Sequence, residues 1–518
     1  MTDEASASPE SDLDGGGRLA RNIASVGGSQ LVTWAFSAVA IVVVPRALGP
    51  TALGQLGFAS AVWGIGALFT NFGSSALINR EVARDRATGS QILSNVLPMQ
   101  GIAWTAVATV IFGYTLLGDF DSTQATLMFI VGFGALIGEP AQALMAAIIG
   151  QERLVLSSAL SVVDRALVAI ATVAAVLLGY GVEVVAAVGF VGTALVLIVM
   201  IGLMRRDEEI QIDLTLRQHR SVINQAVPLM LLGGALVVYR EIDVITLKAL
   251  ADDESVGLYS ATDRLFGAML LVPGAVTFAL FPTMARRWSS DPEGVLVTLR
   301  RICGLLALFT LPVAAGALLL GPQIAVTILG DDFERSGDVM RVYGIVLIPV
   351  AWTGVLGMLC QISKRERIWT YVLLASAAAT IPLDVVLVPW TDDRFGNAAL
   401  AGALAFLVTE TGAVVYGFRR VLPGVFDAAF RSTIYRTLPA LAAMVGVVWF
   451  LQDLFILVPV AVGGAVYGLG VLATGAIRLD ELATIGGPFE RFARFRSNPA
   501  DPPQEDEAPD STNPRSRK

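Results

Sequence analysis

The chain has 518 residues, of which 55% are hydrophobic and only 15% are charged. A soluble protein carries about 25% charged residues, so most of this chain has to face lipid. One His and two Cys (Cys303 and Cys360) exclude a Cys/His metal centre, a haem protein and a disulfide scaffold. The net charge of −8 argues against nucleic-acid binding, which needs a basic patch. The composition predicts an all-α polytopic membrane protein.

Fourteen stretches are apolar and long enough, at about 20 residues, to cross a hydrocarbon core of about 30 Å. In chain order they are 23–44, 52–78, 96–117, 124–148, 156–179, 184–204, 222–250, 257–284, 297–320, 337–361, 368–389, 398–418, 437–452 and 454–477. Charges or prolines interrupt the first, seventh, eighth and eleventh spans, so their ends are the least sharply defined. The last two nearly touch and are expected to form a tight hairpin.

The distribution of arginine and lysine predicts the orientation of these spans. With the N-terminus inside, the outer loops hold only four basic residues, Arg46, Arg335, Arg341 and Arg394. The inner loops hold most of the others, as the positive-inside rule requires. A missed helix would have inverted this bias further along the chain, and no inversion is present. The sequence therefore predicts a protein of the plasma membrane with both termini in the cytoplasm.

Two outer hairpins have similar sequences. Arg46 and the Ala-Leu after it lead through a short turn to Gly54, and Lys248 followed by Ala-Leu leads in the same way to Gly257. The hairpins fall at spans 1–2 and 7–8, which predicts a parallel repeat of six helices. Such repeats build transporters with a cavity between the two halves. The alternative is that any two outer hairpins share these features.

The expected fold is two six-helix lobes related by this parallel pseudo-repeat, followed by a C-terminal helical hairpin. Its predicted parts are a disordered N-terminal tail (1–20), an N-lobe of helices 1–6 (21–204), a cytoplasmic linker (205–221), a C-lobe of helices 7–12 (222–420), helices 13–14 (421–478) and a cytoplasmic, largely disordered tail (479–518). The N-terminal stretch is acidic and lacks an apolar core, so it does not read as a signal peptide.

Four sequence blocks, spread over most of residues 20–420, carry a family resemblance. They are PRALGPTALGQLGFASAVWGIGALFTNFGSSALINREVAR, DVITLKALADDESVGLYSATDRLFGAMLLVPGAVTFALFPTMARR, ILGDDFERSGDVMRVYGIVLIP and FGNAALAGALAFLVTETGAVV. In this order and spacing they resemble the polysaccharide biosynthesis, lipid-linked oligosaccharide flippase family of the multidrug/oligosaccharidyl-lipid/polysaccharide exporter superfamily. The resemblance implies about 12 to 14 helices in two lobes that move a polyprenyl-linked glycan by alternating access.

Ionisable residues inside a membrane helix cost several kcal/mol unless they are paired or face water. The candidates are Glu139, Asp164, Arg165, Arg240, Glu241, Asp243, Lys248, Asp263, Arg264, Asp384 and Glu410. The densest group lies on the seventh and eighth spans, on either side of the turn 252–255. Counting about 1.5 Å per residue places Arg240 and Asp243 at nearly the same depth as Asp263 and Arg264, roughly 12–18 Å below the outer end.

Four arginines are the candidate phosphate-binding or cavity residues: Arg240, Arg264, Arg165 and Arg46. Arginine binds phosphate through bidentate, charge-assisted hydrogen bonds, which suits the phosphate of a lipid carrier. Pairing of Arg240 with Asp243 or Asp263 is the alternative within the cluster, since both signs of charge are present. For Arg46, at the end of its helix, the alternative is a side chain that reaches the membrane surface.

Four acidic residues are the candidates for ion coupling or gating: Glu139, Asp243, Asp263 and Glu410. Glu139 precedes Pro140 in the middle of the fourth span, where proline frees a backbone carbonyl and kinks the helix. An acid beside a kink suits a gating helix or a cation site. A protonated carboxyl group bonded to the freed carbonyl is the alternative, and Glu410 has the same two interpretations.

The sequence predicts a flippase that moves a polyprenyl (dolichol-type) phosphate-linked sugar or oligosaccharide from the inner to the outer leaflet by alternating access, for cell-surface polysaccharide or glycoprotein assembly. The alternatives are a multidrug or metabolite exporter of the same superfamily and a membrane-embedded glycan polymerase. Helices 13 and 14 disfavour the former, and the short outer loops disfavour the latter. No enzymatic activity, cofactor or metal is expected. The expected partners are the lipid-linked glycan, membrane lipids and glycosyltransferases of the same pathway, with no nucleic acid.

Overall fold

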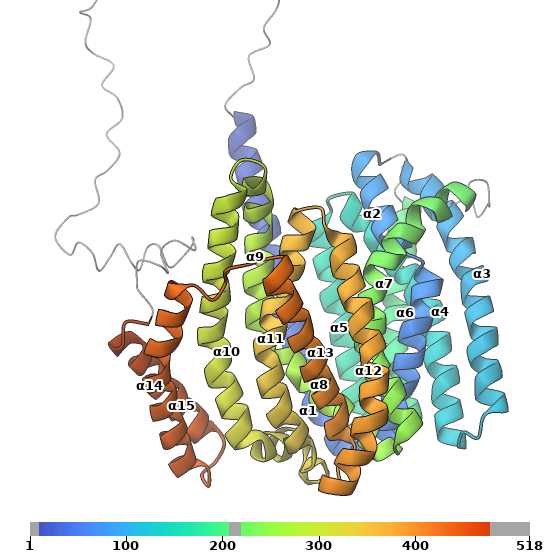
Figure 1. The fold of residues 1–518 in the computed structure, drawn as a ribbon. Coiled ribbons are helices and arrows are strands. Elements are labelled where there is room, and N and C mark those ends of the chain that lie inside the picture. The colour runs from blue at the N-terminus through green and yellow to red at the C-terminus, as the bar shows by residue number, and fades with distance from the viewer. Residues whose placement is uncertain (1–9, 87, 207–218, 477–518) are drawn as a thin grey trace, which may run out of the picture.

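The computed structural model describes residues 10–86, 88–206 and 219–476, and nearly all of them lie in α-helices. No strand occurs within those ranges. Figure 1 shows the helices packed side by side, most of them running along the same direction of the molecule. The all-α architecture that the composition predicts is therefore confirmed.

The first half of the chain is built around one long, kinked helix. Its helices are α1 (Glu10–Asn71), α2 (Ser74–Arg84), α3 (Thr88–Leu117), α4 (Ser122–Gly150), α5 (Leu154–Leu177) and α6 (Val182–Arg206). The kink in α1 lies at Gly49, whose φ of 73° falls in the left-handed region that glycine tolerates. The second expected span, 52–78, ends early, because Phe72 and Gly73 have positive φ and separate α1 from α2.

The second half contains two bent helical spans and a C-terminal hairpin. Its elements are α7 (His219–Leu250), α8 (Asp253–Met269), α9 (Leu271–Trp288), α10 (Pro292–Leu329), the 3₁₀ turn η1 (Asp331–Phe333), α11 (Ser336–Ile362), α12 (Glu366–Phe395), α13 (Ala399–Arg420), α14 (Ala428–Leu451) and α15 (Leu457–Ala473). The bend within α7 is 48° and the bend between α8 and α9 is 46°. These bends fall in the seventh and eighth expected spans, which the sequence marks as interrupted.

Within the described ranges, ten helices are long and apolar enough to cross a membrane, and the number rises to twelve if each bent pair is one span. The expected count of fourteen is not confirmed by this measure. One reason is that α1 consists of two helices joined at the non-helical Gly49 and enters this number once. Another is that α15 has only 17 residues, fewer than the roughly 20 that a span needs.

Helix α1 begins at Glu10, within the stretch 1–20 that the sequence analysis assigns to an N-terminal tail. The bounds of that tail stay a prediction. Residues 1–9, most of the predicted linker and the C-terminal tail lie outside the described residues.

Two groups of helices make up the body of the molecule. In the first, α1 packs against α4 and α5, and α6 packs against the same two helices. In the second, α7 packs against α12, α11 packs against α10 and α13, and α12 packs against α13. The α1–α8 and α1–α7 pairs join the groups, while the α14–α15 hairpin packs against α10 at one edge in Figure 1. Two lobes and a hairpin fit this packing, and the lobe boundaries stay a prediction.

Helices α1 and α8 meet at the two glycines that the repeat places at equivalent positions. A Cβ atom added to Gly54 would lie 1.8 Å from the carbonyl oxygen of Asp253. One added to Gly257 would lie 1.8 Å from the carbonyl oxygen of Pro50. Beside them, the Gln55 side chain donates to the Asp253 carboxylate at 3.3 Å. The two helix groups therefore touch backbone to backbone here, at a spacing that only glycine permits.

Candidate functional site

Two buried carboxylates lie in the interface between α7 and α12. Asp243 is 4% exposed and Asp384 is 0% exposed. The Tyr259 hydroxyl donates to Asp243 Oδ2 at 2.8 Å, and the Thr246 hydroxyl donates to Asp384 Oδ2. Because Thr246 follows Asp243 by one helical turn on α7, this bond brings Asp384 close to Asp243. The two carboxyl groups also interact electrostatically.

The second oxygen of each carboxylate has no hydrogen-bond partner. Asp243 Oδ1 and Asp384 Oδ1 are both buried, and neither meets a donor within the part of the chain that the structure describes. Burying an uncompensated negative charge costs several kcal/mol, and two neighbouring charges cost more. A proton or a small cation removes this cost by neutralising charge and satisfying the free oxygens. This α7–α12 pair is therefore a candidate ion site.

A mixed-sign cluster lies beside this pair, where α7 faces α8. Asp263 of α8 interacts electrostatically with Arg240 of α7 and with its neighbour Arg264. Asp243 also interacts electrostatically with Asp263. The Tyr343 hydroxyl of α11 donates to Asp263 Oδ1 at 3.4 Å. The structure thus brings together four of the residues singled out in the sequence, Arg240, Asp243, Asp263 and Arg264.

The two arginines of this cluster interact with carboxylates only at longer range, Arg240 with Glu241 and Asp263, and Arg264 with Asp263. Arg240 is exposed and Arg264 is half-buried. Neither forms a salt bridge or hydrogen bond with another described residue. The alternative in which an ion pair of Arg240 fastens α7 to α8 is therefore not seen in this structure. Both guanidinium groups keep their N–H donors free for a ligand with phosphate chemistry.

Glu410 of α13 lies in a separate, fully bonded network. The Tyr239 hydroxyl donates to Glu410 Oε1 at 2.9 Å, and the Thr353 hydroxyl donates to Oε2 at 2.7 Å. The Tyr239 hydroxyl also lies 3.0 Å from that of Thr409. The residue is 5% exposed, and each of its oxygens has a donor, so this carboxyl group holds α7, α11 and α13 together.

Glu139 of α4 has similarly complete hydrogen bonding. Thr70 donates to its Oε1 at 2.9 Å, and the Asn71 amide donates to its Oε2 at 3.0 Å. Both donors come from the last turn of α1, next to the break that precedes α2. Glu139 therefore ties α4 to the end of α1 through side chains. Its partners are not the backbone carbonyl that Pro140 frees.

The remaining two arginines lie apart from the cluster. Arg46 donates from Nε to the carbonyl oxygen of Ile328 at 3.0 Å and from Nη2 to that of Thr327. These carbonyls end α10, where a cation compensates the negative end of the helix dipole. Arg165 of α5 is exposed and has no polar contact with the cluster in the described ranges. The structure thus gives Arg46 a helix-capping contact.

Several site residues were not singled out from the sequence. Asp384 is only one of the eleven charged candidates, and the hydroxyl donors Tyr259 and Thr246 are not among the predicted site residues. The spacing of Asp243 and Thr246, three residues apart on one face of a helix, is the sequence signal that could have identified Thr246 as a site residue. No group of three or more His, Cys, Asp or Glu that could hold a metal occurs among the described residues.

Comparisons with known proteins place the chain. The model of the polysaccharide biosynthesis protein family matches residues 19–288, which is more than half of the chain. Among solved structures, the lipid II flippase MurJ in an inward closed conformation has a TM-score of 0.70 at 13% identity, covering 87% of this chain and 98% of its own. No curated protein matches the chain by sequence.

Other similar structures are transporters. An inward-facing multidrug resistance MATE family transporter of the MOP superfamily has a TM-score of 0.60 at 15% identity, covering 76% of this chain and 94% of its own. A MOP superfamily transporter from Pyrococcus furiosus has a TM-score of 0.53 at 14% identity, covering 78% and 94%.

The apolar helices and the shared fold define a multi-pass membrane protein with the architecture of the MOP superfamily. Within that class, the chain belongs to the polysaccharide biosynthesis protein family.

Proposed function

We propose that this protein is a flippase that moves a polyprenyl phosphate-linked sugar or oligosaccharide from the inner to the outer leaflet, without covalent chemistry. The observation that carries the proposal is the pair of membrane arginines, Arg240 and Arg264, that lack an ion-pair partner in the described residues. An unpaired arginine within a membrane span is costly. An anionic ligand that enters the protein offsets that cost, and the phosphate of a lipid carrier is such a ligand.

The comparisons are compatible with a lipid substrate. The structure of the lipid II flippase MurJ covers 87% of this chain, and that of the MATE transporter covers 76%. Family membership points to polysaccharide assembly as the setting. A drug or metabolite exporter with the same fold is the alternative.

We also propose that Asp243 and Asp384 form the ion-coupling site. Each has one free oxygen in a buried position, and Asp243 lies beside the arginine cluster, to which Asp263 links it. Uptake of a proton or cation neutralises the pair, while binding of phosphate neutralises the arginines. Because Asp243 and Arg240 share α7, occupancy of one site changes the electrostatic energy of the other, which is the coupling that a driven flippase requires.

Alternating access in this protein requires two contacts between the helix groups to open in turn. One is the Gly54–Gly257 contact of α1 with α8. The other joins the break after α1 to α7: a Cβ added to Gly73 would lie 2.6 Å from the Ala226 carbonyl oxygen, and Arg80 donates to Gln225 at 3.0 Å. Both contacts are closed in this structure.

The test uses the full-length protein in liposomes with a polyprenyl phosphate-linked hexose on one side. Transfer is followed by the fraction of hexose that becomes accessible to a membrane-impermeant oxidant. Arg240→Ala is expected to weaken apparent affinity about tenfold or more, since a charge-assisted contact is worth about 1.5–3 kcal/mol. Arg240→Lys keeps the charge but loses the bidentate geometry, so we expect an intermediate value.

The control is Arg301→Ala, which removes an exposed arginine of α10 outside the cluster and should leave transfer unchanged. The double variant Arg240→Ala with Asp263→Asn separates the two explanations. If Arg240 only balances Asp263, removing both charges restores transfer. Full recovery in the double variant therefore contradicts the phosphate role of Arg240, and drug transport without any lipid transfer contradicts the flippase proposal.

A further inference from the structure

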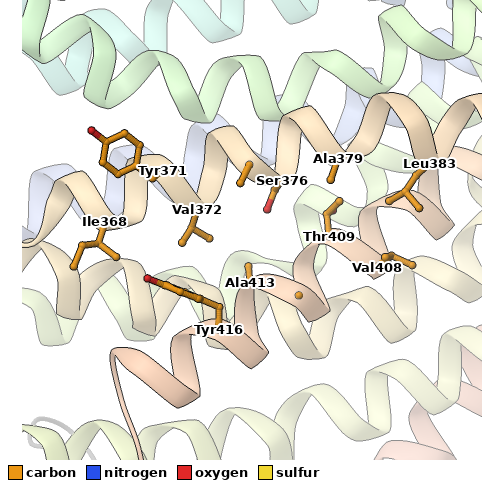
Figure 2. A pocket seen from close by; sticks show the side chains of 12 residues that line it. Ile368, Tyr371, Val372, Ser376, Ala379, Leu383, Val408, Thr409, Ala413 and Tyr416 are labelled. Carbon is orange, nitrogen blue, oxygen red and sulfur yellow. The ribbon is translucent and has the colours of Figure 1, made fainter.

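An apolar groove runs between α12 and α13 and belongs to none of the sites above. Its volume is about 500 Å³, within the range of about 300–1,000 Å³ that is usual for ligand sites. Figure 2 shows α12 side chains from Ile368 to Leu383 facing α13 side chains from Val408 to Tyr416. Tyr371 is 69% exposed and Val408 is 53% exposed, so the groove opens to the surface of the helix bundle.

The length of the groove fits an extended hydrocarbon chain. From Ile368 to Leu383 the α12 wall spans 15 residues, which is about 22 Å at 1.5 Å per residue. Carbon atoms in contact lie about 3.5–4.0 Å apart, so an extended chain can lie along this wall in van der Waals contact with its apolar side chains.

One end of the groove is strongly basic. Arg365 and Arg367 flank the start of α12, and Arg419 and Arg420 end α13; all four are exposed. None forms an ion pair with another residue that the structure describes. Arg367 lies one helical turn before Tyr371, and both α13 arginines lie one turn after Tyr416, at the end of the groove marked by these tyrosines in Figure 2. Glu366 is the one carboxylate among them.

The other end of the groove reaches a buried polar network. Thr409 lines the groove, and its hydroxyl lies 3.0 Å from that of Tyr239 on α7. Tyr239 also donates to Glu410. A chain that fills the groove therefore presses against a residue bonded to α7, the helix that carries Arg240 and Asp243.

We propose that this groove holds the hydrocarbon chain of a single-chain lipid phosphate, with the phosphate bound among the four arginines. The mainly apolar lining favours a hydrocarbon occupant, and the basic end selects an anionic headgroup. This inference rests on the proposed function, because the occupant is the lipid carrier of the substrate class. It assigns the carrier a second binding place, for tail and phosphate together, on α12 and α13, distinct from the Arg240 and Arg264 site of the transfer step.

The experiment uses full-length protein in phosphatidylcholine liposomes with a polyprenyl phosphate that carries a photoreactive diazirine in its chain. Labelled peptides mapped by mass spectrometry are expected in α12 and α13. Gly412→Phe places a ring at the groove wall, at a position where nothing lies within 4 Å of an added Cβ; we expect labelling to fall at least fivefold. Ala379→Phe does so from α12 and serves if the first variant misfolds.

The matched control is Gly464→Phe on α15, another exposed glycine with nothing within 4 Å of an added Cβ, and it should label like the unmodified protein. Arg367→Ala with Arg420→Ala should lower labelling several-fold and weaken its dependence on salt. Unchanged labelling in both groove-filling variants overturns the proposal. So does equal competition by diacyl phosphatidylglycerol, which identifies bulk lipid as the occupant. A failure of the flippase proposal is distinct, since it appears as absent hexose transfer in vesicles that still label.

Discussion

The Glu139 site and the Asp243–Asp384 site bury the same chemical group and treat it differently. Glu139 receives a donor on each oxygen, from Thr70 and Asn71. Asp243 and Asp384 each receive one donor and leave the other oxygen free. A carboxyl group with a donor on each oxygen fixes the helices around it in place. A buried carboxyl group with one oxygen lacking a donor needs a proton or cation, which can bind and dissociate. In our proposal this difference in hydrogen bonding, and not burial, distinguishes a structural acid from one that binds the coupling ion.

The largest expected effect comes from removing charge at the incomplete site. Asp243→Asn or Asp384→Asn deletes a ligand for the coupling ion, so we expect gradient-driven transfer to fall about tenfold to a hundredfold, matching a lost charge-assisted contact of about 1.5–3 kcal/mol. Transfer in liposomes under an imposed sodium or proton gradient measures it. If both variants show gradient-driven transfer at the rate of the unmodified protein, Asp243 and Asp384 do not bind the coupling ion.

The next largest effect is expected from removing the fully hydrogen-bonded carboxyl group of Glu139. Glu139→Ala leaves the Thr70 hydroxyl with only the Ala67 carbonyl oxygen and the Asn71 amide with only the Ser75 hydroxyl as acceptor. We expect a cost of about 1–3 kcal/mol in the free energy of unfolding. We expect a lower melting temperature in detergent and unchanged transfer per folded molecule. A large drop in transfer with normal stability would instead make Glu139 an ion carrier.

A smaller effect is expected from the hydroxyl that supports the incomplete site. Tyr259→Phe removes the only hydrogen-bond donor to the Asp243 carboxylate in the described structure. Losing this hydrogen bond costs about 1 kcal/mol, so the affinity for the ion should change about fivefold. Titrating transfer with sodium or with pH measures the shift. If maximal rate falls while ion affinity stays the same, the tyrosine serves another step.

The smallest effect is expected at Glu410. Glu410→Gln keeps an acceptor for Tyr239, and the Thr353 hydroxyl can rotate to accept from the new amide, so the cost stays below about 1 kcal/mol. Melting temperature and transfer should both remain close to those of the unmodified protein. Loss of ion dependence in this variant would move the coupling site to α13.

The sequence predicts what lies within one helical hairpin and misses what depends on packing between distant segments. The α7–α8 cluster follows from counting residues on each side of one turn, because helix rise fixes depth. Asp384 joins Asp243 only after α12 packs on α7, and Arg46 reaches Ile328 across 282 residues. No periodicity in the chain encodes such contacts.

Helix starts could have been predicted more closely than hydrophobic windows allowed. Helix α10 begins at Pro292 rather than near 297, with the Asp291 side chain accepting from the Gly294 amide. Asp427 caps α14 in the same way, well before the expected start at 437. Both are familiar N-terminal signals, an aspartate cap with or without proline after it. They lie in polar loop sequence, where a hydropathy window gives no signal.

The reciprocal glycines of α1 and α8 have a consequence for genetics. Each glycine is confined by a backbone carbonyl of the opposite repeat, Gly54 by Asp253 and Gly257 by Pro50. No smaller side chain exists that could relieve a substitution at either position. Suppressor mutations of a Gly257 defect must therefore shift a whole helix, and the two positions should behave as one locus: damaging both should be hardly worse than damaging either.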